Sequence, residues 1–91
     1  MDADAARGAD LVMRARWKYV CYADADGHEV LETFEPSTLH AAYVSEEGID
    51  RGRLISAGFA TADGECYGVS TSLNLPSRPL ADTALLRMLL G

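Results

Sequence analysis

The sequence predicts an α+β domain of two ββα units (ββαββα), forming a mainly antiparallel four-stranded sheet with two helices on one face. Three observations support this prediction. Strand-like segments occur in two pairs, each pair encloses the triplet Ala-Asp-Gly, and a segment with helical features follows each pair. A shift of 37 residues also superposes Arg16 on Arg53 and Tyr22 on Phe59. The two copies differ too much to establish an internal duplication.

The first half of the chain is expected to form a hairpin and a helix. Residues 16–23 (RWKYVCYA) are dense in aromatic and β-branched residues, as strands are, and residues 28–34 (HEVLETF) follow as the return strand. Residues 35–48 begin with a Pro-Ser-Thr sequence that can start and cap a helix. Gly48 stands where a left-handed glycine would end that helix.

The second half is expected to repeat this order. Residues 53–61 (RLISAGFAT) form a strand, residues 65–73 (ECYGVSTSL) its return, and residues 80–90 (LADTALLRMLL) the last helix. The Ala/Asp-rich residues 1–10 predict a flexible tail, and residues 11–91 a single domain.

The repeated Ala-Asp-Gly triplet can be tested against a calcium loop of the EF-hand type. With Gly27 at the sixth position, Asp24 and Asp26 occupy ligand positions three and five. Tyr22 and Thr33 then occupy positions one and twelve, where oxygen ligands are required. The pattern therefore does not support a calcium loop.

A three-residue hairpin loop explains both triplets better. Such a loop needs a left-handed residue at its third position, which glycine adopts without strain. Residues 25–27 and 62–64 fit this pattern, with strand-like segments on both sides. We therefore predict positive φ angles at Gly27 and Gly64.

The second loop also predicts which residues share a face of its hairpin. Phe59 falls opposite Tyr67, and Ala57 opposite Val69. One face is then apolar, and it carries Ile55, Ala57, Phe59, Tyr67, Val69 and Leu73. The other is small and flat, and it carries Ser56, Gly58, Ala60, Cys66, Gly68, Ser70 and Ser72. We expect helices to cover the apolar face and leave the flat face exposed.

Composition and charge argue against several classes of protein. The formal net charge is −6, with one lysine against seven arginines, and this field repels the phosphate backbone of nucleic acids. No apolar run approaches a membrane span. The acidic N-terminus does not resemble a signal peptide, which favours a cytoplasmic protein with reduced cysteines. Direct nucleic-acid or membrane binding is not expected.

No recognisable catalytic, cofactor or metal motif is present. The spacing of Cys21, His28, His40 and Cys66 does not match zinc modules, whose ligands come in close pairs. The chain contains no phosphate-binding loop, dinucleotide fingerprint, nucleophile elbow or zincin helix. We therefore expect no enzyme activity, no cofactor, no metal and no disulfide.

Four residues are candidates for contact with a ligand or partner. Trp17, His40 and Tyr43 are expected near the boundary between sheet and helices, and Arg78 lies between two prolines that stiffen its loop. His40 borders an apolar helix face, where a buried, hydrogen-bonded histidine explains the pattern better than a general base.

The last helix predicts self-association. A helical projection assigns one arc to cover the sheet, containing Leu80, Ala81, Ala84, Leu85, Met88 and Leu89. Leu86 and Leu90 lie outside this arc as a second apolar strip, which suggests a homodimer. The flat face of the second hairpin is the other route to a dimer.

These features favour a small, acidic, non-enzymatic module that acts in protein interaction or regulation. The second hypothesis is a small-ligand-binding protein with a pocket between sheet and helices. The third is an acidic mimic of nucleic acid, which the net charge permits although the carboxylates are dispersed.

Overall fold

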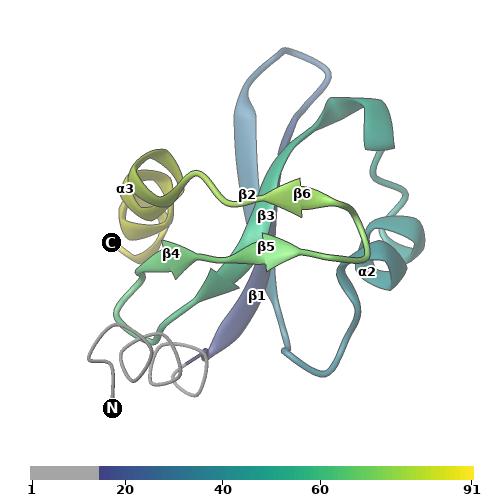
Figure 1. Cartoon of the computed structure of the whole chain (residues 1–91). Coiled ribbons are helices and arrows are strands. Elements are labelled where there is room, and N and C mark those ends of the chain that lie inside the picture. Colours follow the sequence, from purple (N-terminus) through teal and green to yellow (C-terminus); the bar gives the residue numbers. More distant parts are fainter. Residues whose placement is uncertain (1–14) are drawn as a thin grey trace.

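The computed structural model describes residues 15–91, and Figure 1 shows their arrangement. The predicted flexible tail, residues 1–10, and the first four residues of the predicted domain lie outside the described residues. In chain order the elements are β1 (Trp17–Ala23), β2 (Glu29–Phe34), α2 (His40–Glu46), the 3₁₀ helix η1 (Arg51–Arg53), β3 (Leu54–Ala60), β4 (Cys66–Tyr67), β5 (Val69–Ser70), β6 (Leu75–Pro76) and α3 (Pro79–Leu90). None of the described helices is long and apolar enough to span a membrane.

The main sheet has four strands in the order β2-β1-β3-β4. Every neighbouring pair is antiparallel, and Val20 of β1 lies between Glu32 of β2 and Ala57 of β3. The predicted α+β class, with a four-stranded antiparallel sheet and two helices, is confirmed. β5 and β6 form a separate two-stranded ribbon.

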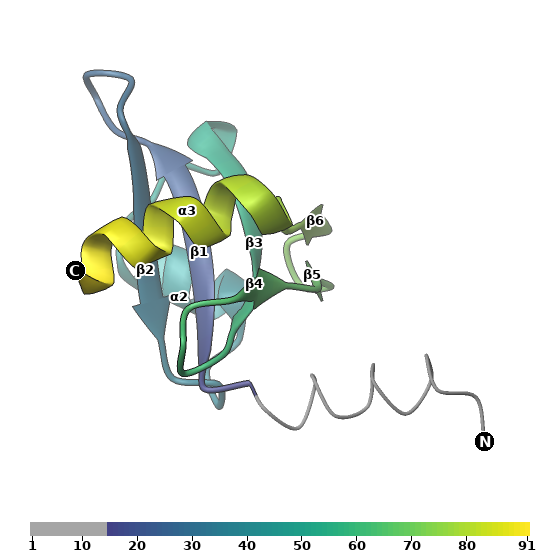
Figure 2. The ribbon, with the colours of Figure 1, turned by 90° about the vertical axis from the view of Figure 1, so that its left-hand side faces the viewer.

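The two helices pack on opposite faces of the main sheet, so the prediction of two helices on one face is wrong. Tyr19 belongs to a core cluster with Leu86 of α3, whereas its neighbour Val20 belongs to a second cluster with Val44 of α2. Adjacent strand residues point to opposite faces. Figure 2 shows α3 on the near side of the sheet and α2 on the far side. The sheet is the middle layer of three.

Both Ala-Asp-Gly triplets form the predicted loops, with φ angles of 83° at Gly27 and 88° at Gly64. One residue before each triplet, a side-chain oxygen organises the turn. Asp24 Oδ1 accepts the backbone N–H of His28 at 2.9 Å, and Thr61 Oγ1 accepts that of Glu65 at 3.1 Å. Asp24 and Thr61 are related by the same shift of 37 residues, so the two hairpins share more than their glycines.

The second hairpin ends earlier than predicted. Phe59 pairs with Tyr67 as expected, but Val69 pairs with Pro76 of β6 instead of Ala57. The strand breaks at Gly68, which has a φ of 84°. A side chain at Gly68 would come within 2.8 Å of the Phe59 ring. The predicted return strand over residues 65–73 is therefore replaced by β4, β5 and a turn.

Most of the small face of the second hairpin is buried, and only Gly68 and Ser72 of its predicted members are exposed. Its members Ser56, Ala60 and Cys66 are buried. Ala60 and Cys66 lie in the cluster that Leu86 of α3 completes. Small side chains at these positions leave room for the helix to approach the sheet.

Helix α2 is shorter than residues 35–48. It begins after Leu39, which makes no side-chain cap, so the predicted start at the Pro-Ser-Thr sequence is wrong. Its end matches the prediction. Gly48 has a φ of 68°, its N–H donates to the Ser45 carbonyl, and the Ile49 N–H donates to the Val44 carbonyl. These bonds form a Schellman motif.

We predict that Gly64→Ala lowers the free energy of unfolding by more than Gly27→Ala. Both residues are left-handed, and each alanine costs about 1 kcal/mol for that reason. A Cβ at Gly64 also meets Leu90 at 3.2 Å and Arg87 at 3.3 Å, whereas nothing lies within 4 Å at Gly27. Urea denaturation of both variants measures the difference. A neutral Gly64→Ala would contradict the left-handed loop.

Candidate functional site

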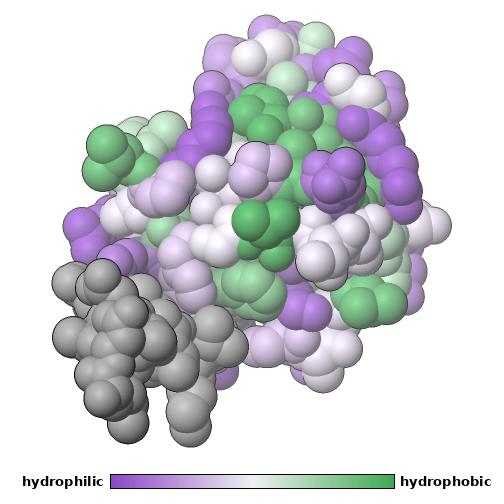
Figure 3. Space-filling view, viewed as in Figure 1, coloured by the Kyte–Doolittle hydropathy of each residue, from purple (hydrophilic) through white to green (hydrophobic). Residues whose placement is uncertain are grey.

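Helix α3 combines a buried polar anchor with an exposed apolar surface. Its sequence has only three polar side chains, Asp82, Thr83 and Arg87. A helix that is apolar nearly all round is normally buried on every side. Here the sheet covers one side only, and Figure 3 shows apolar side chains at the surface over α3, at the left of the molecule.

The anchor is Asp82, whose side chain has no exposed surface. Its carboxyl oxygens accept hydrogen bonds from the Tyr19 hydroxyl at 2.5 Å and the Ser56 hydroxyl at 3.0 Å. The backbone N–H of Arg78, the residue before the helix, donates to the same carboxyl at 2.8 Å. Asp82 therefore ties the start of α3 to β1 and β3. Burial, reinforced by the bond to Asp82, raises the pKa of Tyr19, so its hydroxyl keeps the proton that it donates.

Arg78 completes this network from the helix start. Its guanidinium donates to Asp82 Oδ1 from Nε at 3.1 Å and from Nη2 at 2.9 Å. Nη2 also pairs with Glu29 Oε1 of β2 at 2.7 Å. The hydrogen bond to Glu29 raises the pKa of Arg78, and the same bond lowers the pKa of Glu29. Arg78 is a candidate for contact with a ligand or partner on sequence grounds, and in the structure its guanidinium is bonded to Asp82 and Glu29.

The network sets which side of α3 faces the sheet. Asp82 and Leu86, one turn apart, both point inward, and Leu86 is only 3% exposed. The predicted exposure of Leu86 is therefore wrong, because this residue belongs to the core. Leu90 is 61% exposed, as expected for the end of the helix.

The arc predicted to cover the sheet largely faces outward. Leu80 is 90% exposed and Met88 is 78% exposed, and Ala81 and Ala84 between them are also exposed. We call Leu80, Ala81, Ala84 and Met88 the outer face of α3. Leu89 flanks it and is 61% exposed. The outer face is continuous because its residues recur at helical spacing.

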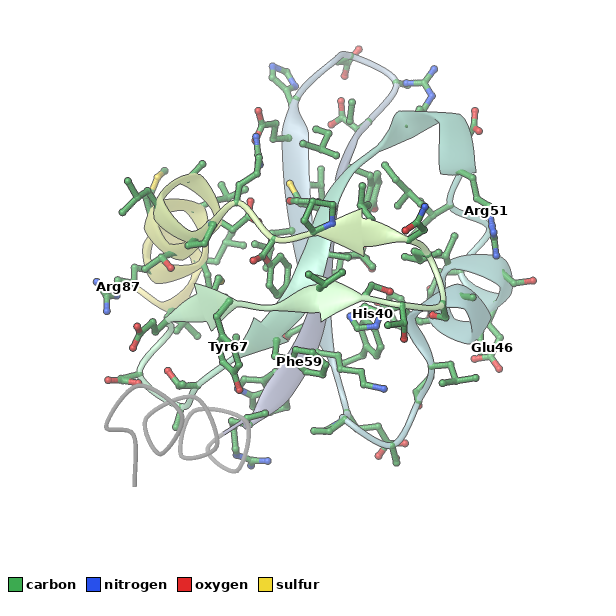
Figure 4. The ribbon with its side chains drawn as sticks, viewed as in Figure 1. His40, Glu46, Arg51, Phe59, Tyr67 and Arg87 are labelled. Carbon is green, nitrogen blue, oxygen red and sulfur yellow. The ribbon has the colours of Figure 1, made fainter. Side chains whose placement is uncertain are left out.

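A shallow groove of about 360 Å³ runs beside the outer face, between α3 and β4. Opposite charges lie at its edge, Glu65 from the β3–β4 loop and Arg87 from α3. Figure 4 shows the Arg87 side chain extending away from the molecule. The groove is lined by Glu65, Cys66, Pro79, Leu80, Thr83, Ala84 and Arg87. Burial raises the pKa of the Cys66 thiol to about 11, so it is a poor nucleophile at neutral pH.

The four predicted contact residues do not form one pocket. Trp17 packs on the α3 side of the sheet, next to the cluster that contains Tyr19, and its ring lies 4.5 Å from the Arg16 guanidinium carbon. Tyr43 packs on the α2 side, against the cluster that contains Val44. The sheet separates the two groups.

His40 is a buried, hydrogen-bonded histidine, as the sequence favours. Its Nε2 lies 2.9 Å from the Gly58 carbonyl oxygen, to which it donates. The rings of Phe34 and Phe59 meet it edge-on, and Figure 4 shows His40 and Phe59 close together. Burial lowers the pKa of His40. This residue joins α2 to β3 and is not available to a substrate.

Tyr43 belongs to a second polar cluster, on the α2 side. Its ring stacks on Phe34, with centroids 4.1 Å apart, and its hydroxyl donates to Glu32 at 2.6 Å. Tyr22 donates to the other oxygen of Glu32, and this bond raises the pKa of Tyr22 to about 12. The two phenols hold Glu32 between them and brace β2 against α2.

Asp24, Asp26 and His28 at the first hairpin bring possible metal ligands within 4.8 Å of one another. The turn itself explains this proximity. Asp24 Oδ1 accepts the backbone N–H groups of Asp26 and His28, each at 2.9 Å. Asp26 and His28 are exposed and Asp24 is partly buried, and the cluster is consistent with an ordinary turn stabilised by an aspartate side chain.

No protein-family model, curated protein or solved structure matches this chain. The site must therefore be judged by its own geometry. Sequence reasoning overlooked Asp82, although one signal was available: the single acidic residue of a largely apolar helix, four residues after an arginine. That spacing permits an i, i+4 pair at the helix start.

We predict that Asp82→Ala lowers the free energy of unfolding by about 3 kcal/mol, because it leaves buried donors on Tyr19 and Ser56 without their acceptor. Asp26→Ala, at an exposed loop position, removes the same charge and should cost less than about 1 kcal/mol. Chemical denaturation of both variants gives the comparison. Equal, small losses would show that Asp82 does not anchor α3.

We predict that stability falls as the pH drops from about 6.5 toward 5, partly through His40. Its pKa is lowered in the folded state from an ordinary value of 6.5, so the unfolded chain binds the proton first. The stabilisation is complete above pH 6.5, and its loss cannot exceed about 1.4 kcal/mol per pH unit. His40→Gln should reduce this slope, and His28→Gln, at an exposed position, should retain it. Denaturation at several pH values tests both.

Proposed function

We propose that this chain is a non-enzymatic protein-interaction module, and that the outer face of α3 is its contact surface. The observation that carries the proposal is the exposure of Leu80 and Met88 on a helix whose opposite side is already anchored by Asp82. Exposed apolar patches of this kind mark contact sites when they are continuous. The acidic N-terminal sequence supports a cytoplasmic location for this module.

The burial of the reactive side chains supports a role in binding rather than catalysis. Cys21 and Cys66 are buried, and burial raises the pKa of each thiol. His40 is held by a backbone carbonyl, and its pKa is lowered. Asp82 is surrounded by donors from the fold itself. Among the described residues, these groups stabilise the structure and are poorly placed to meet a substrate.

The two alternative functions receive less support from this geometry. A ligand pocket between sheet and helices was expected near Trp17 and Tyr43, which lie on opposite sides of the sheet. An acidic mimic of nucleic acid needs rows of carboxylates. The outer face of α3 has none, and the groove beside it is lined by both an acidic residue, Glu65, and a basic residue, Arg87. We therefore favour a contact that is apolar at its centre and charged at its edge.

We predict that a photo-crosslinking amino acid at position 88 forms adducts with protein in the producing cells. Met88 is 78% exposed on the outer face of α3. The matched control is position 46, an exposed residue of α2 outside this surface. Gel shift and mass spectrometry identify the adducts.

A second variant carries both the crosslinker at position 88 and the substitution Leu80→Glu, and it should lose the adduct. Its thermal melt should be unchanged, because Leu80 is 90% exposed. The same yield at positions 46 and 88, or no adduct at position 88, would refute the proposed contact surface.

A further inference from the structure

The outer face of α3 has a self-complementary pattern. Leu80, Ala84 and Met88 are spaced by four residues and form a line along the exposed side of the helix. The two end residues are large and the central one is small. We propose that the partner of this surface is a second copy of the chain, bound through an antiparallel α3–α3 contact centred on Ala84. This inference rests on the proposed function and names its partner.

A two-fold axis at Ala84 places each large residue of one copy opposite a large residue of the other copy. In an isologous dimer, if one residue contacts a second residue of the partner subunit, that second residue makes the same contact in return. Leu80 packs against Met88 of the partner subunit, about 6 Å along the helix from the axis on either side. The two Ala84 residues meet at the crossing point, where a small side chain lets helices approach to about 8 Å.

The charges beside this line favour the same arrangement. Glu65 and Arg87 both lie at the groove, on one side of the outer face. A two-fold axis perpendicular to the helices and lying in the contact plane keeps that side common to both copies. Glu65 and Arg87 of both copies then lie along the same edge of the contact. One surface that carries both signs of charge is suited to bind itself.

The size of the contact predicts a reversible dimer. Helix α3 has 12 residues and is therefore about 18 Å long. Two such helices with their adjoining grooves fall below the roughly 800 Å² per partner of a standard stable interface. The net charge of −6 on each copy adds repulsion, which salt screens. We therefore expect association at micromolar concentration that strengthens as salt increases.

Sedimentation equilibrium of the purified chain tests the partner. The wild type should be dimeric at tens of micromolar, and Ala84→Glu should be monomeric. At dilutions where both are monomeric their thermal melts should agree, since Ala84 is exposed. Ser45→Glu adds the same charge at an exposed position of α2 and should remain dimeric. Leu80→Glu is the second disrupting variant. A monomeric wild type, or dimers of both disrupting variants, would overturn the proposal.

Disulfide trapping tests the geometry. Ala84→Cys should form a linked dimer on mild oxidation, because the two residues meet at the axis. Leu80→Cys should not, since antiparallel copies of residue 80 lie about 12 Å apart along the helix, beyond the reach of a disulfide. Leu80→Cys/Met88→Cys should link again. The wild type, whose two cysteines are buried, provides the background. Linking by Leu80→Cys alone would indicate a parallel contact and overturn the antiparallel arrangement.

The two proposals fail separately. A monomeric wild type together with adducts to a different protein at position 88 would refute self-association and leave the interaction module intact. A dimer that Ala84→Glu does not disrupt, with no adduct at position 88, would refute the outer face of α3 in both roles.

Discussion

The buried carboxyl group of Asp82 is the constraint on which the rest of the structure depends. It accepts hydrogen bonds from β1 through Tyr19, from β3 through Ser56 and from the helix start through Arg78. A helix that is apolar on most sides has no strong preference for the side it buries. The cost of leaving a buried donor unpaired supplies that preference. Asp82 thus fixes the rotation of α3, places Leu86 in the core and leaves Leu80 and Met88 outside.

This division separates the residues that stabilise the domain from those proposed to bind. The inner side of α3 is part of the core, whereas the outer face contributes little to the isolated chain because it remains exposed. The ion pair between Arg78 and Glu29 ties the start of α3 to β2, and it therefore helps to hold the helix that carries the outer face. A rigid helix presents its outer side chains at low entropic cost on binding. The fold therefore holds the outer face of α3 in place, although the outer face contributes little to the stability of the isolated chain.

Both faces of the central strands must be covered, and this explains the placement of the two helices. Three consecutive residues of β1, Tyr19, Val20 and Cys21, are fully buried, so neither face of that strand is open to water. Such strands are typical of a sheet with a layer on each side. The small residues Ser56 and Ala60 looked like an exposed flat face in the sequence, but they are buried where α3 approaches. A row of small side chains on a strand can therefore indicate that a helix packs closely against the sheet, as well as an exposed flat surface.

The sequence by itself determined the local features of this protein. The two hairpin loops with left-handed Gly27 and Gly64, the strands β1, β2 and β3, and the end of α2 at Gly48 depend on contacts within a few residues, which local patterns encode. Only the tertiary structure decided which faces of the sheet the helices cover and which side of α3 points inward. Those choices depend on pairs far apart in the chain, Tyr19 with Asp82 and Glu29 with Arg78. The apolar periodicity of α3 does not predict which side of the helix faces the sheet, because hydrogen bonds between distant residues set its orientation.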